Sequence, residues 1–277
     1  MGWNIGHSGE VGLFVGGENI IRDHLIFYLD PGDYNCIPDS TGNDDEVTDL
    51  ALGDVGSITS DDDEINDMWT TADGGPCLTF NQADNHKIVF PTIDISEFFT
   101  GTSTTTGAFT CCFWFRTGHD YSSGNNGAMF AIENYSFAVA FENGYLTAYA
   151  SGNPTNTEYI RVTNGGTTYN DDNWHFVCTV WNNTASTIGD TAVNKALIYV
   201  DDMIDDVTST TYDDIDSDFV FDSTNINLTI GQFIGPSWFF EGELGPIMFY
   251  GDYCLNEEER IINYNYHSHR YYDTAIG

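Results

Sequence analysis

Over most of the 277-residue chain, short runs of β-branched and aromatic residues alternate with Gly, Asn, Asp and Thr, and amphipathic patterns of helical length are missing. Runs of this kind predict β-strands. Asn143 and Gly144 separate two of them, and this dipeptide is a strong signal for a two-residue hairpin because both positions tolerate a positive φ. Many strands joined by turns predict a β-sandwich or a jelly roll.

The predicted strands share a content of Val, Ile, Phe, Tyr, Trp and Thr. They are 24–29, 77–80, 86–90, 109–116, 129–133, 136–142, 145–150, 159–162, 174–181, 196–200, 225–230 and 245–250. Both faces of 174–181 are partly apolar, which is typical of a strand covered on both sides and favours two packed sheets. We interpret the acidic segments 39–73 and 201–222 as long loops.

One helix is predicted near the C-terminal end. Asn256 followed by Glu259 forms a capping-box pattern, and the three Glu residues of the first turn suit the helix dipole. The pattern continues through Tyr264, for about two turns. The aromatic stretch 267–272 is expected to pack on the rest of the chain.

The chain carries 7 Lys and Arg residues against 43 Asp and Glu, a formal net charge of −36. A surface this acidic repels the phosphate groups of nucleic acids. We therefore exclude nucleic acid as a partner. No apolar run is long enough for membrane insertion, and the N-terminal stretch lacks the basic and apolar regions of a signal peptide. The 6 cysteines show no metal-binding spacing, and we interpret most of them as small buried hydrophobes.

A set of ordered blocks carries a family resemblance. These are 75–91, 109–115 with Trp114, 173–180 with Trp174 and His175, 196–202, 228–250 with its glycines, and 255–259. Together they resemble the laminin-G-like, concanavalin A-like jelly-roll family. The resemblance implies an all-β fold, namely a concanavalin A-like jelly-roll sandwich of two antiparallel sheets with one short C-terminal helix. This domain would occupy 24–277 and include the long acidic loop 39–73.

Segments 19–30, 39–43 and 263–271 resemble, more narrowly, the laminin-G-like virion structural proteins of tailed phages of marine bacteria and cyanobacteria. The resemblance implies a capsid decoration, fibre or tail component that is made in the host cytoplasm and located in the virion. Its partners would be other virion proteins and further copies in a homo-oligomer. Segment 1–23 would be an N-terminal docking segment, whose candidate assembly residues are Trp3, Ile5, Leu13 and Phe14.

Two other functions remain as alternatives. A lectin-like module for host attachment would bind surface polysaccharide through aromatic residues in or beside loops, for which Tyr121, Tyr145, Tyr212 and Trp238 are the candidates. A glycoside hydrolase would need two carboxylates, and the spacing of Glu241 and Glu243 would put both on the same side of a strand. Carboxylates at this position are ordinary surface groups in the family, so we assign no catalytic residues and expect no enzyme.

The sequence requires no cofactor, although Ca²⁺ is a candidate because loop carboxylates suit a hard cation. The candidate ligands are Asp61, Asp63, Glu64, Asp171, Asp172, Asp201 and Asp202. The alternative is that these loops are acidic and solvated. His175 is interpreted as a strand residue with a polar partner rather than a metal ligand.

Overall fold

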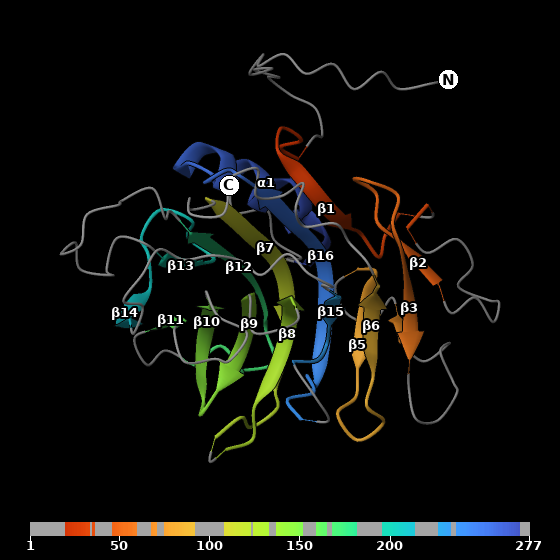
Figure 1. Ribbon diagram of the computed structural model, residues 1–277, viewed down its shortest axis with the longest axis horizontal. Helices are drawn as coiled ribbons and strands as arrows, with labels where there is room; N and C mark the ends of the chain where they lie inside the picture. The colour runs from red at the N-terminus through yellow and green to blue at the C-terminus, as the bar shows by residue number, and fades with distance from the viewer. Residues whose placement is uncertain are drawn as a thin grey trace.

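The computed structural model describes residues 20–33, 35–36, 46–59, 68–70, 75–91, 108–122, 124–132, 137–151, 159–164, 168–181, 196–213, 227–233 and 237–271. These residues form two antiparallel sheets packed face to face and one helix near the C-terminal end (Figure 1). The predicted all-β sandwich with a C-terminal helix is therefore confirmed.

The first sheet has seven strands. In spatial order they are β13 (Ala196–Val200), β12 (Trp174–Trp181), β7 (Phe109–Arg116), β16 (Gly242–Gly251), β5 (Cys77–Phe80) and β4 (Trp69–Thr70), and β1 (Leu25–Leu29) also pairs with β16. β7 and β12 pair along their whole length. Every residue of β12 is buried, which confirms that this strand is covered on both faces.

The second sheet has nine strands. In spatial order they are β14 (Thr208–Asp213), β11 (Tyr159–Asn164), β10 (Tyr145–Ser151), β9 (Phe137–Glu142), β8 (Gly127–Ile132), β15 (Leu228–Ile230), β6 (Lys87–Phe90), β3 (Val55–Thr59) and β2 (Glu46–Thr48). β9 and β10 form the predicted hairpin. Asn143 and Gly144 have φ values of 51° and 85° at its turn.

The prediction that the two acidic segments are loops is wrong in part. Segment 39–73 contains β2, β3 and β4, and segment 201–222 contains β14. These are short or Thr-rich strands near the sheet edges, with little apolar alternation of their own. Of β3, only Gly56 and Ile58 are buried. β3 is stabilised by pairing with β6, β14 by pairing with β11, β2 by pairing with β3 and β4 by pairing with β5. A local sequence pattern does not report such pairing.

The core between the sheets is built from aromatic rings. Phe109 lies 5.0 Å from Phe137 in an edge contact and stacks on Trp181 at 5.5 Å. Each fully buried side chain of this size contributes about 1.5–3 kcal/mol. The cluster joins β7, β9 and β12, so it holds the two sheets together.

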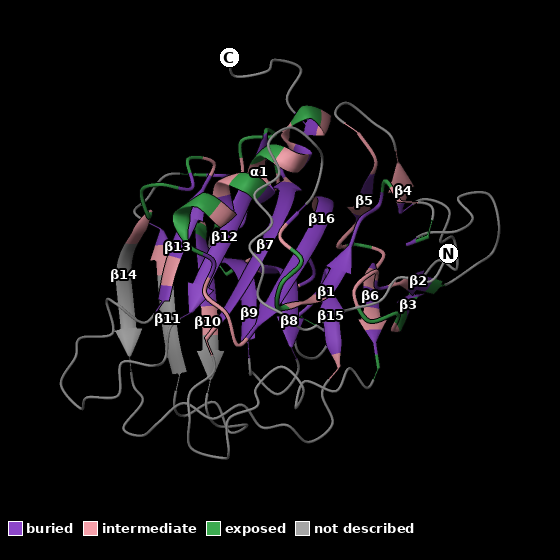
Figure 2. Ribbon diagram, turned by 90° about the horizontal axis from the view of Figure 1, so that it is seen from above, coloured by how far each residue is buried: buried purple, intermediate pink, exposed green. Residues whose placement is uncertain are grey.

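Helix α1 (Glu257–Tyr271) covers the outer face of the seven-stranded sheet (Figure 2). The predicted capping box is confirmed. The Glu259 N–H donates to Asn256 Oδ1 at 3.1 Å, and the Asn256 N–H donates to Glu259 Oε2 at 2.8 Å. The helix is longer than the two turns predicted, because His267 and Tyr271 in its second half are buried against the sheet.

Ile20 and Ile21 pack on the same face as α1. Ile20 is buried, and the Ile21 N–H donates to Asn263 Oδ1 at 3.0 Å. Segment 1–19, with Trp3, Ile5, Leu13 and Phe14, lies outside the described residues, so the docking segment stays a prediction. No helix in the described ranges is long and apolar enough to cross a membrane.

All six cysteines are free thiols, and the interpretation of most of them as small buried side chains is confirmed. Cys254 is partly exposed, and the other five are buried: Cys36, Cys77, Cys111, Cys112 and Cys178.

Candidate ligand-binding site

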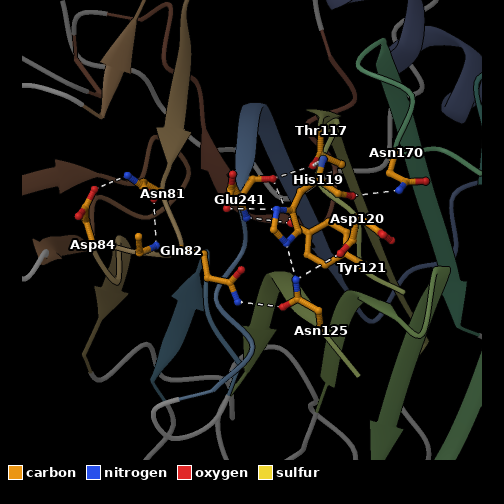
Figure 3. Close-up of polar contacts among 11 residues, drawn as sticks. Asn81, Gln82, Asp84, Thr117, His119, Asp120, Tyr121, Asn125, Asn170 and Glu241 are labelled. Atoms are coloured by element: carbon orange, nitrogen blue, oxygen red, sulfur yellow. Dashed lines mark hydrogen bonds and ion pairs between the residues drawn. The ribbon is translucent and has the colours of Figure 1, made fainter. Parts of the chain in front are cut away.

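Four connections meet at one edge of the sandwich. They are the β5–β6 turn, the loop between β7 and β8, the segment before β12 and the segment before β16. Three of them contribute the side chains that we call the polar rim, which consists of Gln82, His119, Asp120, Asn125 and Glu241 (Figure 3). The segment before β12 joins them through Asn170, whose Nδ2 donates to the His119 carbonyl at 3.0 Å. The β5–β6 turn and the start of β8 lie along the lower edge in Figure 1.

His119 is the centre of the polar rim. Its Nδ1 lies 3.2 Å from Glu241 Oε2, and its Nε2 lies 2.6 Å from Asn125 Nδ2. All these contacts are satisfied when Nδ1 carries the proton and Nε2 accepts from the amide. Asn125 Oδ1 in turn accepts from Gln82 Nε2 at 3.2 Å. One chain of polar contacts therefore joins three connections that are distant in sequence.

Tyr121 corrects a sequence prediction. Its ring is fully buried and stacks on Phe141 at 4.9 Å, so it cannot stack on a sugar as predicted. The hydroxyl accepts from the Glu241 N–H at 2.8 Å and donates to the Glu241 carbonyl at 3.0 Å. Burial raises the pKa of this hydroxyl well above its usual range. Tyr121 thus anchors the backbone that carries Glu241.

A group of aromatic rings lies on the outer face of the nine-stranded sheet. Tyr149, Phe233 and Trp238 form the aromatic surface, with ring centroids 5.2–6.0 Å apart. Phe233 is buried, whereas Tyr149 and Trp238 are partly exposed. Beneath them lie small side chains of β8 and β9, namely Ala128, Ala131, Ala138 and Ala140.

Trp238 was predicted from the sequence, whereas Tyr149 and Phe233 were missed. The sequence signal that could have identified Tyr149 is the alternation of inward and outward side chains along β9 and β10. Leu146 and Ala148 face the core, which leaves Tyr149 for the outer face above the alanines of β9. Nothing local to Phe233 indicates that it meets Tyr149, because the contact depends on how the chain folds between β15 and β16.

The backbone at Trp238 has a φ of 67°, which is rare for a bulky side chain. Its carbonyl accepts hydrogen bonds from the Ala128 N–H at 3.0 Å and the Phe233 N–H at 3.4 Å. Strained residues of this kind cluster at ligand sites. Trp238 also precedes Glu241 by three residues, so segment 237–241 contributes to both the aromatic surface and the polar rim.

The other two aromatic candidates lie apart from one another. Tyr145 begins β10 beside the hairpin turn, and its residue is 47% exposed. The turn is tied to the loop of the polar rim, since the Asn143 N–H donates to Asn126 Oδ1 at 3.1 Å. Tyr212 lies on β14 opposite Arg161, and its side chain is outside what the structure describes.

Two of the predicted calcium ligands, Asp171 and Asp201, contact the side chain of His175. Asp201 Oδ2 lies 2.8 Å from its Nδ1, and Asp171 Oδ1 lies 3.0 Å from its Nε2. Burial opposes a charge on this ring, but the two carboxylates outweigh it and raise the pKa of His175. The predicted polar partner of His175 is confirmed.

The remaining calcium candidates form no site that the structure shows. Asp172 and Asp202 each donate a backbone N–H, to the Thr117 and Val200 carbonyls. Within the described residues no three Asp, Glu, His or Cys side chains are grouped to hold a metal. Asp61, Asp63 and Glu64 are outside those residues, so calcium binding there stays a prediction.

The two carboxylates considered for hydrolysis have separate partners. Glu243 makes a two-point ion pair with Arg116, in which Nη2 donates to Oε1 at 2.7 Å and Nε donates to Oε2. Glu241 faces His119 and is 46% exposed. The ion pair engages both oxygens of Glu243, so this pair does not offer one free acid and one free base.

Comparisons with known proteins support the fold. No family model matches the chain, and no curated protein matches it. Among solved structures, it is similar to the binding domain of Paraclostridial Mosquitocidal Protein 1, with 12% identity and a TM-score of 0.56 over 89% of this chain and 52% of that chain. It is also similar to the ligand-binding domain of botulinum neurotoxin serotype D in complex with N-acetylneuraminic acid, with 16% identity and a TM-score of 0.53 over 90% and 52%.

A third similar structure is the binding domain of botulinum neurotoxin DC in complex with rat synaptotagmin II, with 12% identity and a TM-score of 0.56 over 91% and 53%. The chain thus spans about half the length of the solved domains it matches. At these identities the likeness shows a shared β-sandwich fold.

Proposed function

We propose that this chain is a lectin-like binding module that recognises carbohydrate through the aromatic surface and the polar rim. The observation that carries the proposal is segment 237–241, which presents Trp238 beside a network of amide, imidazole and carboxylate groups. Sugars offer apolar ring faces and hydroxyl groups, so their sites combine aromatic faces with a few placed polar groups.

The solved neighbours support a binding role. One was solved in complex with N-acetylneuraminic acid and another in complex with rat synaptotagmin II, so one of these similar domains holds a sugar and another holds a protein. The pairing of Glu243 with Arg116 favours binding over hydrolysis. We therefore place the lectin-like function ahead of both the purely structural role and the hydrolase.

The virion resemblance supplies a setting for this proposal. A module displayed on a fibre, tail or capsid would attach the particle to host surface polysaccharide, and other virion proteins would hold it in place. This setting rests on the sequence blocks 19–30, 39–43 and 263–271. Mass spectrometry and cryo-electron microscopy of purified particles would test it separately from sugar binding.

Direct binding of the full chain to an immobilised library of bacterial and animal glycans tests the proposal. We expect saturable binding to at least one glycan, and we expect Trp238→Ala to weaken it about tenfold or more, the usual cost of truncating a central aromatic anchor. Trp69→Ala is the matched control. It removes a partly buried Trp from the edge of the other sheet and should leave the affinity unchanged.

Three results would contradict the proposal. The wild-type chain could bind no glycan above background, or Trp238→Ala could fold and bind like the wild type. The chain could also shorten a bound polysaccharide with release of reducing ends, which would favour the hydrolase. Circular dichroism of each variant separates lost binding from lost folding.

A further inference from the structure

Two cysteines of the seven-stranded sheet stand directly opposite each other. Cys112 of β7 and Cys178 of β12 are paired in the antiparallel register. Opposite residues in such strands have Cα atoms about 4.5 or 5.5 Å apart, and both values fall in the roughly 4.4–6.8 Å range that a disulfide spans. Their Sγ atoms lie 2.6 Å apart. The backbone therefore needs no movement for the two sulfurs to bond.

The surroundings make this pairing specific. Both thiols are fully buried between the sheet and α1, in a cluster with Trp114 and Met248. Cys111 belongs to the cluster on the opposite face of the sheet. Cys254 donates its thiol to the Trp181 carbonyl at 3.0 Å. Cys77 belongs to the same cluster, but the 2.6 Å separation makes Cys112 and Cys178 each other's nearest sulfur partner.

We propose that Cys112 and Cys178 are an oxidation site, at which a small-molecule disulfide such as oxidised glutathione forms an intrachain disulfide. One cysteine thiolate attacks a glutathione sulfur and releases the first glutathione thiolate, which takes up a proton. The second cysteine thiolate then attacks the mixed disulfide and releases the second glutathione. The protein loses two electrons and two protons, and one oxidised glutathione becomes two thiols.

Burial governs when this reaction happens. It raises the pKa of the Cys112 thiol well above its usual range, so in the folded chain Cys112 is almost entirely protonated at neutral pH. Exchange then needs a local opening of β12 from β7, or it occurs before the two strands have paired. The pair should therefore stay reduced in a reducing cytoplasm and oxidise during folding or slow opening in an oxidising medium.

The loop closed by the cross-link would contain part of the site described above, namely His119, Asp120, Asn125 and Tyr149. The segment between Cys112 and Cys178 contains β8, β9, β10 and β11, together with the loop that carries His119. Closing a loop of this length restricts the unfolded chain. The oxidised form should melt at a temperature higher by about 5 °C or more. This inference does not depend on what the chain binds.

The test is to unfold the full chain in urea, refold it with a mixture of reduced and oxidised glutathione, block free thiols under denaturing conditions and measure the intact mass. We expect four blocked thiols where the reduced chain has 6. Peptide mapping without reductant should yield one cross-linked pair containing Cys112 and Cys178. A sample incubated natively with oxidised glutathione should reach the same product more slowly.

Two variants serve as comparisons. Cys112→Ser should keep all five of its thiols free, whereas Cys36→Ser, which alters another fully buried cysteine, should still form the cross-link. Peptide mapping of the wild type decides the question even if Cys112→Ser fails to fold. Six free thiols after both treatments would overturn the proposal. A cross-link between other cysteines, or a stable glutathione adduct on one of these two, would also overturn it.

Discussion

Two groups of side chains with the same chemistry, a tyrosine, a histidine and a carboxylate, lie in different surroundings. Beneath α1, the Tyr28 hydroxyl donates to Asp30 Oδ2 at 2.9 Å and lies 3.1 Å from His267 Nε2. Arg270 Nη1 donates to Asp30 Oδ1 at 2.6 Å. The side chain of Asp30 is 4% exposed and that of His267 is 0% exposed.

At the polar rim, the corresponding residues are Tyr121, His119 and Glu241. His119 Nδ1 lies 3.2 Å from Glu241 Oε2, and the Tyr121 hydroxyl holds the Glu241 backbone. The side chains of His119 and Glu241 are 21% and 46% exposed, although Tyr121 itself is buried. The His119 and Glu241 side chains of this network are therefore in contact with water.

Burial explains why the two networks act differently. Buried polar groups bond to protein rather than to water, so the contacts of His267 and Arg270 with Tyr28 and Asp30 fix the helix on the sheet. A half-exposed group exchanges its water for a ligand without leaving a buried charge unpaired. The chemistry of the side chains alone does not separate a stabilising network from a binding one, but their exposure does.

The largest expected effect follows from removing the charge of Asp30. Asp30→Asn leaves Arg270 without its buried counter-charge, and breaking such a pair costs about 3–5 kcal/mol. Urea unfolding should show this loss, with sugar binding unchanged in the folded fraction. Asp120→Asn, at an exposed carboxylate, is the control and should leave the stability nearly unchanged. Equal effects at the two positions would contradict the comparison.

The same variant should change the response to acid. Burial opposes ionisation of Asp30, but its contacts with His267 and Arg270 outweigh burial and lower its pKa below the usual range. A lowered folded-state pKa contributes stability that is present above the unfolded value of about 4 and is lost as the pH falls. The stability difference between the wild type and Asp30→Asn should therefore shrink below pH 4.

An intermediate effect is expected at Tyr121. Tyr121→Phe keeps the buried ring but leaves the Glu241 N–H and carbonyl without the hydroxyl, at a cost of about 1–3 kcal/mol. Because Tyr121 positions the segment that bears Trp238, glycan affinity should also fall in the folded variant. Urea titration and binding assays measure the two effects. A loss of stability with full affinity would show that Tyr121 does not position the binding surface.

The sequence predicted those parts of the molecule that depend on local patterns. The strands of the core, the hairpin at Asn143 and the cap at Asn256 each follow from a few neighbouring residues. The strands β2, β3, β4 and β14, at or next to the sheet edges, were missed because pairing, rather than their own composition, holds them in the sheets.

The candidate site was harder to predict for the same reason. Trp238 was found because it lies in a loop, but its partner Tyr149 comes from a hairpin nearly 90 residues earlier in the chain. Tyr121 lies in a similar loop and is buried, because Phe141 and the backbone of Glu241 enclose it. Exposure of a loop aromatic is set by tertiary contacts that no local pattern contains.

The smallest expected effect, and the finest test of the comparison, concerns the pH dependence of two buried histidines. Burial lowers the pKa of His267, and its contacts with Asp30 do not restore it. At the edge of the sandwich, Asp201 and Asp171 overcome burial and raise the pKa of His175. The two shifts have opposite directions, so the pH dependence of stability should have opposite signs for the two histidines.

The two histidines should respond to pH in opposite directions. A raised pKa gives stability that is complete below the unfolded value of about 6.5 and is lost as the pH rises through the folded value. His175→Gln should therefore cost more at pH 6 than at pH 9. For His267, the unfolded chain binds the proton more readily, so acidification below about pH 6.5 favours unfolding of the wild type. The stability lost in His267→Gln should accordingly shrink from pH 8 to pH 5. Urea titrations of both variants across this range measure the two slopes, and slopes of the same sign would show that the two histidines do not differ in the way their surroundings predict.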